Sequence, residues 1–235
     1  MTNERFLRSA MLLGEDKINS LASKKVAIFG LGGVGSYAAE AIARSGVGTV
    51  EIIDNDIVSI TNINRQLCAL NSTVDLAKTE VVAARIKDIN PDATVIARRS
   101  FFMPENSHEF DFSSYDFVID AIDTVAAKLE IIRICSAKGI PMISCMGTGN
   151  KLDPSQLKVT DLAKTSGCPL ARVMRRELKA IGITHIPVIY STEPPITPLG
   201  ECSEGGKRTV GSVAFVPSVA GLLAASEAIK ALCKK

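Results

Sequence analysis

The sequence contains no tryptophan, and aromatic residues make up only 5% of it. A protein that stacks single-stranded bases on aromatic platforms is therefore not expected. An excess of one charge is also missing, because 27 basic residues against 25 acidic ones leave a net charge of +2. The chain as a whole has no strong attraction for polyanions, so any contact with nucleic acid has to be a local patch.

Cysteine pairs with metal-ligand spacing are absent as well, so no zinc site is expected. No two of the six cysteines form CxxC: Cys68, Cys135, Cys145, Cys168, Cys202 and Cys233. The polar residues 1–5 are not followed by an apolar segment, which predicts no signal peptide and a cytoplasmic location with reduced thiols. The apolar stretch 213–225 is interrupted by Pro217 and Gly221, and we expect a core helix there rather than a membrane span.

Short apolar runs alternate with amphipathic segments along the first half of the 235 residues. Strands are expected at 25–30, 49–54, 93–97, 117–121 and 140–145, and helices at 34–45, 76–89 and 124–138. Strands that are apolar throughout and are joined by helices predict an α/β fold. Its core would be a Rossmann-like, doubly wound, mainly parallel sheet with helices on both faces.

The second half has a different texture, with frequent proline, glycine, serine and threonine after about residue 151. Short strands are expected at 157–161 and 188–192, a basic helix at 169–179, a mobile loop near 197–207 and a final helix at 219–232. We therefore predict one domain in four parts. They are a helical arm (1–24), a nucleotide-binding core (25–154), a cap or substrate region (155–215) and a C-terminal helix (216–235).

A glycine-rich motif, GLGGVG at residues 30–35, joins the first strand to the first helix. Glycine allows a tight turn there and lets backbone N–H groups approach a phosphate at the helix N-terminus. The motif predicts nucleotide contacts at Gly30, Gly32, Gly33 and Gly35. Asp54, 19 residues after Gly35, is placed to accept hydrogen bonds from ribose hydroxyls, and the spacing alone leaves NAD open as the nucleotide.

Charged residues beyond the motif favour a triphosphate. Arg65 and Lys78 supply cations for the roughly four negative charges of ATP. Asp120 and Asp123 follow the fourth strand, whose end faces the same crevice, and a carboxylate there can hold Mg²⁺. The alternatives are that Lys78 is a solvated helix residue, that Arg65 pairs with Asp56, and that Asp123 caps the following helix.

Together these motifs resemble the ThiF/MoeB superfamily of adenylating enzymes, which are related to ubiquitin-activating enzymes. The resemblance covers about residues 5–150 and rests on GLGGVG, DNDIV at 54–58, TNINRQ at 61–66, Lys78 and DAID at 120–123. It implies that a substrate carboxylate attacks the α-phosphate of ATP and that pyrophosphate leaves. Catalytic roles are implied for Arg8, Arg65, Lys78 and Asp123, with Asp123 as the magnesium ligand. Besides the glycines, the implied nucleotide contacts are Asp54, Asp56, Asn62, Asn64, Arg65, Gln66, Lys78, Asp120 and Asp123.

The N-terminal segment RFLR at residues 5–8, followed by LLG at 12–14, also fits this superfamily. The resemblance implies a homodimer in which Arg8 reaches across to the partner's ATP. The alternative is that Arg8 is an ordinary surface helix residue.

The second half resembles one branch of the superfamily, the tRNA threonylcarbamoyladenosine dehydratases, on residues 147–154, 159–165, 169–171, Arg175 and 190–193. The resemblance implies ATP-dependent cyclisation of the threonylcarbamoyl side chain on adenosine 37 of tRNA. The side-chain carboxylate is adenylated, the carbamoyl oxygen attacks it, AMP leaves and an oxazolone ring closes. Such an intramolecular closure needs no enzyme nucleophile. The basic residues expected to meet the tRNA, or else to form a solvated face, are Lys164, Arg172, Arg175, Arg176 and Lys179.

Two other functions remain open. An adenylyltransferase for the C-terminal carboxylate of a ubiquitin-like sulfur-carrier protein would need a reactive cysteine, and only Cys168 or Cys202 could serve. An NAD-binding oxidoreductase or sensing module would leave the TNINRQ segment without a role. A monovalent cation and a sulfur-transfer protein are left open as further partners, and His108 and His185 are expected to be structural.

Overall fold

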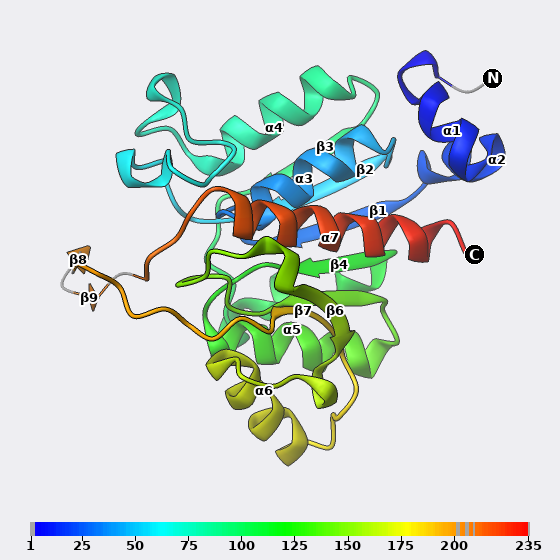
Figure 1. Cartoon of the computed structure of the whole chain (residues 1–235). Helices are drawn as coiled ribbons and strands as arrows, with labels where there is room; N and C mark the ends of the chain where they lie inside the picture. Colours follow the sequence, from blue (N-terminus) through cyan, green and yellow to red (C-terminus); the bar gives the residue numbers. More distant parts are fainter. Residues whose placement is uncertain (1–2, 201–202, 205–206, 209, 235) are drawn as a thin grey trace.

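The centre of the molecule is a seven-stranded sheet (Figure 1) in the order β3-β2-β1-β4-β5-β7-β6. The computed structural model describes residues 3–200, 203–204, 207–208 and 210–234. The strands are β1 (Lys25–Phe29), β2 (Thr49–Ile53), β3 (Thr94–Arg98), β4 (Phe117–Asp120), β5 (Met142–Cys145), β6 (Leu157–Asp161) and β7 (Pro187–Ser191). All neighbours run parallel except β6, which is antiparallel to β7. The predicted fold class is confirmed.

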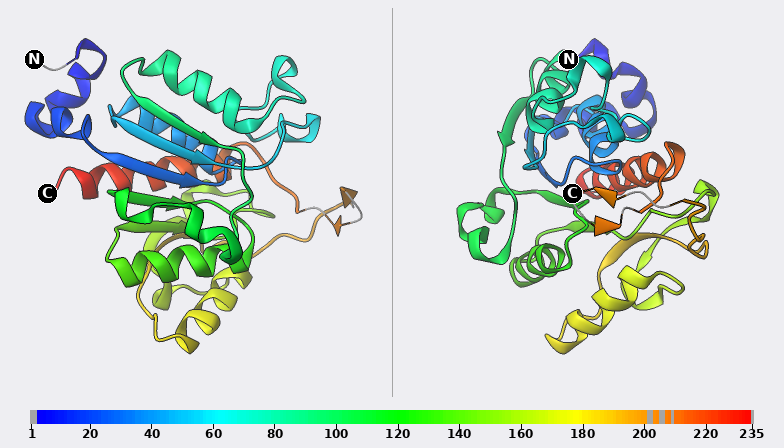
Figure 2. Two further views of the ribbon diagram at one scale, coloured as in Figure 1. Left: turned by 180° about the vertical axis from the view of Figure 1, so that it is seen from behind. Right: turned by 90° about the vertical axis from the view of Figure 1, so that its left-hand side faces the viewer.

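Helices cover both faces of this sheet (Figure 2). One face carries α3 (Gly35–Arg44), α4 (Lys78–Ile89) and α7 (Phe215–Leu232), and the other carries α5 (Val125–Lys138) with α6 (Pro169–Ala180) against it. Each face of the sheet has its own hydrophobic core. In strand β1, Val26 and Ile28 point into the core under α3, α4 and α7, while Ala27 and Phe29 point into the core under α5 and α6. Burial on both faces accounts for strands that are apolar throughout.

The region expected as a cap contributes two strands to the main sheet instead of lying over it. Strand β7 pairs in parallel with β5, and β6 closes that edge. A short pair of strands, β8 (Ser203–Glu204) and β9 (Lys207–Arg208), projects from the body of the molecule (Figure 1). Part of the expected mobile loop, 201–202 and 205–206, lies outside the described residues.

The expected N-terminal arm is helical and lies at the amino ends of the strands, with Phe6 buried in the core (Figure 1). It consists of η1 (Glu4–Phe6), α1 (Leu7–Leu13) and α2 (Glu15–Leu21). Further 3-10 helices are η2 (Ile60–Asn62), η3 (Asn71–Thr73), η4 (Pro104–Glu109), η5 (Phe112–Ser114), η6 (Pro154–Gln156) and η7 (Leu162–Lys164).

Helix α7 begins at Phe215, four residues before the expected start, because Pro217 is tolerated in a first helical turn. In the described part of the chain it is the one helix long and apolar enough to span a membrane by composition. It packs along α3 and the strands β4 to β7, with Ala220, Ala224 and Ala228 fully buried. This burial accounts for its apolar composition and agrees with the expected core helix.

Candidate active site

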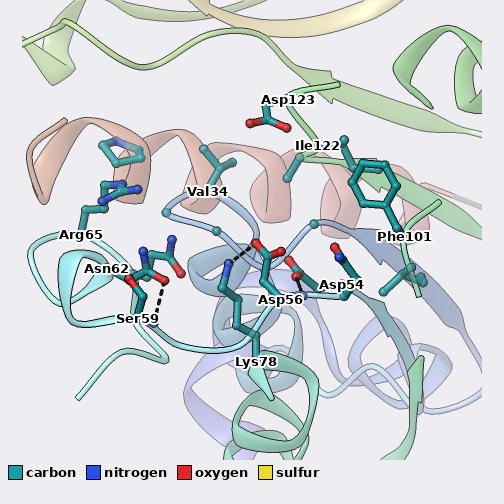
Figure 3. Close-up of a pocket in the computed structure, with 18 of the residues that line it drawn as sticks. Val34, Asp54, Asp56, Ser59, Asn62, Arg65, Lys78, Phe101, Ile122 and Asp123 are labelled. Carbon is teal, nitrogen blue, oxygen red and sulfur yellow. Dashed lines mark hydrogen bonds and ion pairs between the residues drawn. The ribbon is translucent and has the colours of Figure 1, made fainter. Parts of the chain in front are cut away.

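A cavity of about 580 Å³ opens at the carboxyl ends of β1, β2 and β4 (Figure 3). The order of the strands reverses between β1 and β4, and ligands of such sheets bind in the crevice at this point. The wall consists of residues 30, 32–34, 53–57, 59, 62, 65–66, 78, 100–102, 121–123, 148, 212 and 217. Most of the residues predicted from the sequence to bind the nucleotide are therefore brought together.

The glycine turn forms the floor of this cavity. Gly30 has φ +89°, and a Cβ there would lie 2.8 Å from the backbone oxygen of Ala121. Gly32 and Gly33 line the cavity beside it. Gly35 does not, because it sits at the start of α3, where a Cβ would lie 1.7 Å from the Gly30 oxygen. Gly35 therefore lets the helix approach the turn and is not itself part of the wall.

Asp54 ties the end of β2 to the glycine turn. Its Oδ2 accepts a hydrogen bond from the Leu31 N–H at 2.6 Å, and its Oδ1 accepts one from the Asp56 N–H at 2.8 Å. Each carboxylate oxygen has a further lone pair. Asp54 lines the cavity, so it remains able to accept from ribose hydroxyls as predicted.

Lys78 is the first residue of α4 and points into the cavity (Figure 3). It is only 4% exposed, and its Nζ lies 2.8 Å from Oδ2 of Asp56. The Asp56 side chain is exposed, and its backbone oxygen accepts from the Lys78 N–H at 3.1 Å. Two alternatives are therefore wrong: Lys78 is not a solvated helix residue, and Asp56 pairs with Lys78 rather than with Arg65.

The TNINRQ segment folds as a turn around η2. The Ser59 N–H donates to Oδ1 of Asn62 at 3.2 Å, which buries Asn62 at the cavity wall. Gln66 is also buried there. Arg65 reaches the wall while its Nη1 donates to the Thr61 oxygen and to Oδ1 of Asn64, both at 3.0 Å. The turn therefore holds the Arg65 guanidinium through hydrogen bonds to two uncharged oxygens. Because neither oxygen neutralises its positive charge, the guanidinium can still bind an anion.

Asn64 is placed differently from the prediction, because it is not part of the cavity wall. Its Nδ2 donates to the backbone oxygen of Ser212 at 2.9 Å and so ties the residue-212 segment to the rim. Ser212 and Thr148 both line the cavity. Sequence reasoning missed both residues. Thr148 could have been found, because it follows the strand expected at 140–145, whose carboxyl end meets the same edge of the sheet. Nothing local indicates that the chain returns to this edge at Ser212.

Asp123 stands on the side of the cavity opposite Lys78 (Figure 3). It is exposed, and Thr124 Oγ1 lies 3.5 Å from its Oδ1. The N-cap of α5 is Thr124 and has no side-chain cap hydrogen bond, so the alternative of Asp123 as a helix cap is wrong. Among the described residues no cation pairs with Asp123, which leaves its carboxylate free for a ligand in the cavity.

Asp120, also expected at the nucleotide, is not in the cavity. It is fully buried, with Oδ2 at 2.8 Å from Lys128 Nζ and 2.5 Å from Ser144 Oγ. The prediction failed because a strand-end aspartate can turn either to the crevice or into the core, and the sequence does not show that Lys128 lies below it.

The donors available for a metal ion are few. In the described ranges no group of three or more histidine, cysteine, aspartate or glutamate side chains comes together. Mg²⁺ is usually held by one or two carboxylates together with substrate phosphates and water, so an isolated exposed Asp123 suits it. The donor set does not suit zinc, which takes three or four protein ligands.

Arg8 lies on α1, exposed, at the end of the sheet away from the cavity (Figure 1). A single chain therefore does not bring Arg8 to the site. The same helix exposes Leu7, Met11 and Leu12, the last two by 84% and 87%. A helix with this much exposed apolar surface fits contact with another chain.

The basic residues around α6 only partly form the predicted face. Arg172, Arg176 and Lys179 are exposed on α6, and Lys164 is exposed on η7. Arg175 does not join them, because it is half-buried and its Nη1 donates to the Thr165 backbone oxygen at 2.8 Å.

The five cysteines in the described part of the chain are buried and are poor candidates for a nucleophile. Burial raises the pKa of the Cys135 and Cys145 thiols to about 12, and it also raises the pKa of Cys68. Cys168 is 5% exposed and caps α6, its Sγ accepting from the Ala171 N–H at 3.5 Å. Cys202, the other candidate, lies outside the described residues.

Comparison with known proteins agrees with this geometry. The ThiF family matches residues 6–235. The tRNA threonylcarbamoyladenosine dehydratase of Bacillus subtilis is 41% identical, over 98% of this chain and 95% of that protein. The Escherichia coli protein of the same name is 38% identical, over 99% and 94%. The crystal structure of E. coli TcdA in complex with ATP has a TM-score of 0.90 at 38% identity, covering 98% of this chain and 94% of that chain.

A nucleotide cavity at the switch point of a parallel sheet, with a buried lysine and a free aspartate facing each other, defines an adenylating type of site. The chain belongs to the ThiF family. The resemblance of its motifs to the tRNA threonylcarbamoyladenosine dehydratases is confirmed by identity over nearly the whole length.

Proposed function

We propose that this protein uses ATP to cyclise the threonylcarbamoyl side chain on adenosine 37 of tRNA in the cytoplasm, releasing AMP and pyrophosphate. The observation that carries the proposal is the convergence of Lys78, Arg65 and Asp123 on one cavity. It occurs in a chain 41% identical, over 98% of its length, to a protein named for this reaction.

The glycine turn that leads into α3 binds the phosphates of ATP through the backbone N–H groups that line the cavity, with the favourable dipole of the helix behind them. Asp54 accepts from the ribose hydroxyls. Lys78 and Arg65 place positive charge where negative charge grows as the α-phosphate is attacked, which is the largest contribution such a site makes to rate. The buried position of Lys78 strengthens this effect, because nearby water that would screen the charge is excluded.

Asp123 would hold Mg²⁺ on the open side of the cavity. When bound there, the ion neutralises charge on the departing pyrophosphate. The residues present fit this role, since Asp123 is exposed, lines the cavity and is not paired with a described cation.

Ring closure follows without an enzyme nucleophile. The carbamoyl oxygen attacks the adenylated carbonyl carbon, the bond to AMP breaks, and a carbamoyl nitrogen loses a proton. Both reacting groups belong to one side chain, so the protein only has to hold it near the α-phosphate. The buried state of Cys168 supports this direct route over a covalent relay.

The remaining partners are proposed on narrower grounds. We infer a homodimer in which Arg8 completes the partner's site, because Arg8 is remote from the cavity of its own chain and lies on a helix with exposed apolar residues. We also infer that Arg172, Arg176, Lys179 and Lys164 contact tRNA phosphates, since all four are exposed. Such contacts make binding weaker as salt increases.

The test is a nucleoside mass analysis. tRNA bearing threonylcarbamoyladenosine is incubated with the protein, Mg²⁺ and ATP, and mild digestion is followed by a search for the nucleoside minus one water. The proposal expects ATP-dependent formation of this product and a loss of at least about a hundredfold in Asp123→Asn. Unchanged nucleoside with a folded, ATP-binding protein would refute the substrate, and the C-termini of sulfur-carrier proteins would then be tested.

A further inference from the structure

A fully buried ion pair lies directly behind the loop that carries Asp123. Lys128 and Asp120 are both 0% exposed, and Lys128 Nζ lies 2.8 Å from Asp120 Oδ2. The Ser144 hydroxyl donates to the same oxygen at 2.5 Å and lies 3.4 Å from Lys128 Nζ. None of the three lines the cavity, so they do not touch the nucleotide themselves.

Stability alone is a poor reason for such a pair. Replacing a buried ion pair by apolar residues of similar volume is often neutral or stabilising. Lys128 also lies near the amino end of α5, where the helix dipole disfavours a cation. What the pair provides is a fixed orientation of the Asp120 carboxylate, since Lys128 and the Ser144 hydroxyl both hold the same oxygen.

The Asp120 carboxylate also holds the loop between β4 and α5, which carries Asp123. The second oxygen of Asp120, Oδ1, accepts from the Ile122 N–H at 3.2 Å. Ala121, the residue before Ile122, is held to the end of β1, because its N–H donates to the Phe29 oxygen at 2.8 Å. Ala121, Ile122 and Asp123 all line the cavity. The backbone leading to Asp123 is thus held at two successive residues, one of them by Asp120.

We propose that Asp120, oriented by Lys128 and Ser144, is a positioning residue that sets the Asp123 carboxylate at the distance and direction its magnesium ion requires. This inference rests on the metal role proposed above for Asp123. It assigns a task to a buried charge pair that the reaction itself does not use.

The test uses the full chain and measures ATP affinity by calorimetry, once with Mg²⁺ and once with EDTA. The double variant Asp120→Asn with Lys128→Met removes both charges together and leaves neither stranded. It is expected to keep the parent's ATP affinity in EDTA. The Mg²⁺ gain, which is the factor by which Mg²⁺ tightens ATP binding, is expected to be about tenfold smaller than in the parent, as when groups that orient a metal ligand are lost.

The matched control is Arg133→Met on the same helix, which removes a surface ion pair with Glu130 and should change neither affinity. If the double variant does not fold, Ser144→Ala takes its place, and a loss of at least about threefold in the Mg²⁺ gain is expected. A Mg²⁺ gain equal to the parent's in the folded double variant, or in Ser144→Ala, would overturn the inference.

The readout does not depend on RNA, so the two proposals can fail separately. A parent chain that binds ATP more tightly with Mg²⁺ but does not dehydrate tRNA refutes the proposed substrate and leaves the positioning test valid. A parent with no Mg²⁺ gain, or an Asp123→Asn variant that keeps the whole gain, refutes the metal role of Asp123 and this inference with it.

Discussion

At the scale of single residues, the site depends on how a few charges are buried. Lys78 is 4% exposed and has one carboxylate partner, Asp56, whose own side chain is 58% exposed. The pair is therefore asymmetric. The Lys78 side chain is confined to the cavity. The Asp56 carboxylate is in contact with water, so it can give up the ion pair and leave Lys78 free to bind a phosphate.

Lys78→Met removes this cation while keeping the length of the side chain. Turnover is expected to fall by about a hundredfold, because a group that stabilises the transition state is lost. The fold should survive, since Asp56 returns to water. Asp56→Asn is the matched control and should cost much less. Steady-state kinetics with the thermal midpoint measured in parallel would decide, and a Lys78→Met variant within about threefold of the parent would remove Lys78 from the catalytic set.

The cysteines give a second prediction at this scale. Because burial raises the pKa of Cys135 and Cys145 to about 12, both stay protonated at pH 8, where a thiol is a weak nucleophile. Cys168→Ser should leave turnover nearly unchanged, since the proposed ring closure uses no covalent relay. The checks are activity and mass spectrometry after brief alkylation of the folded protein. Complete loss of activity in Cys168→Ser would instead indicate a covalent intermediate.

At the scale of elements, the glycine turn and the β4–α5 loop are built against each other. Gly30 adopts φ +89°, and a Cβ there would lie 2.8 Å from the Ala121 oxygen. The Ala121 N–H donates to the oxygen of Phe29, and Asp120 accepts from the N–H of Ile122, the next residue of the same loop. The floor and one wall of the cavity therefore share a backbone contact. A substitution that shifts the glycine turn should therefore also shift the β4–α5 loop, and the reverse.

Gly30→Ala should destabilise the protein by about 1–3 kcal/mol, the usual cost of a strained backbone conformation, and should weaken ATP binding. Gly32→Ala is the informative control, because a Cβ there meets no atom within 4 Å. It should leave the thermal midpoint unchanged while placing a methyl group where a phosphate would lie. Equal midpoints for the two variants would show that the Gly30 contact is not strained.

Elements were predicted well where the local pattern decides them. The strand expected at 157–161 is observed as β6 with the same bounds, and the buried run 25–30 is β1, one residue shorter. Asp123 could be placed at the cavity from sequence because the ends of parallel strands share one edge, whereas Lys78, on a helix, was placed there by the positive charge that a triphosphate needs. Asp120, Arg175 and Ser212 could not be placed, since each is decided by a tertiary contact. The partners are Lys128 in the core, 8 residues from Asp120, Thr165 beside α6, 10 residues from Arg175, and Asn64 at the cavity rim, 148 residues from Ser212.

At the scale of the whole molecule, the site of one chain is incomplete on the proposed account. Helix α1, which carries Arg8, lies at the amino end of the sheet (Figure 1), and the cavity opens at the carboxyl ends of β1, β2 and β4. A second copy of the chain is the simplest source of the missing arginine.

Mixing two inactive variants tests this arrangement. Arg8→Ala and Lys78→Ala should each lose most of their turnover. After subunit exchange, mixed dimers carry one cavity with an intact Lys78 that receives an intact Arg8 from the other chain, so part of the activity should return. Activity is measured after exchange has been verified by mass. Exchange without any recovery would count against an arginine supplied by the partner.

The central claim is that the substrate carboxylate attacks the α-phosphate of ATP. The most direct measurement places ¹⁸O in the carboxylate of the threonylcarbamoyl side chain and follows the label by mass spectrometry. One labelled oxygen is expected in AMP, because the oxygen that bridges to the phosphate leaves with it when the ring closes. Label in inorganic phosphate together with ADP would contradict it, since the carboxylate would then have attacked the γ-phosphate.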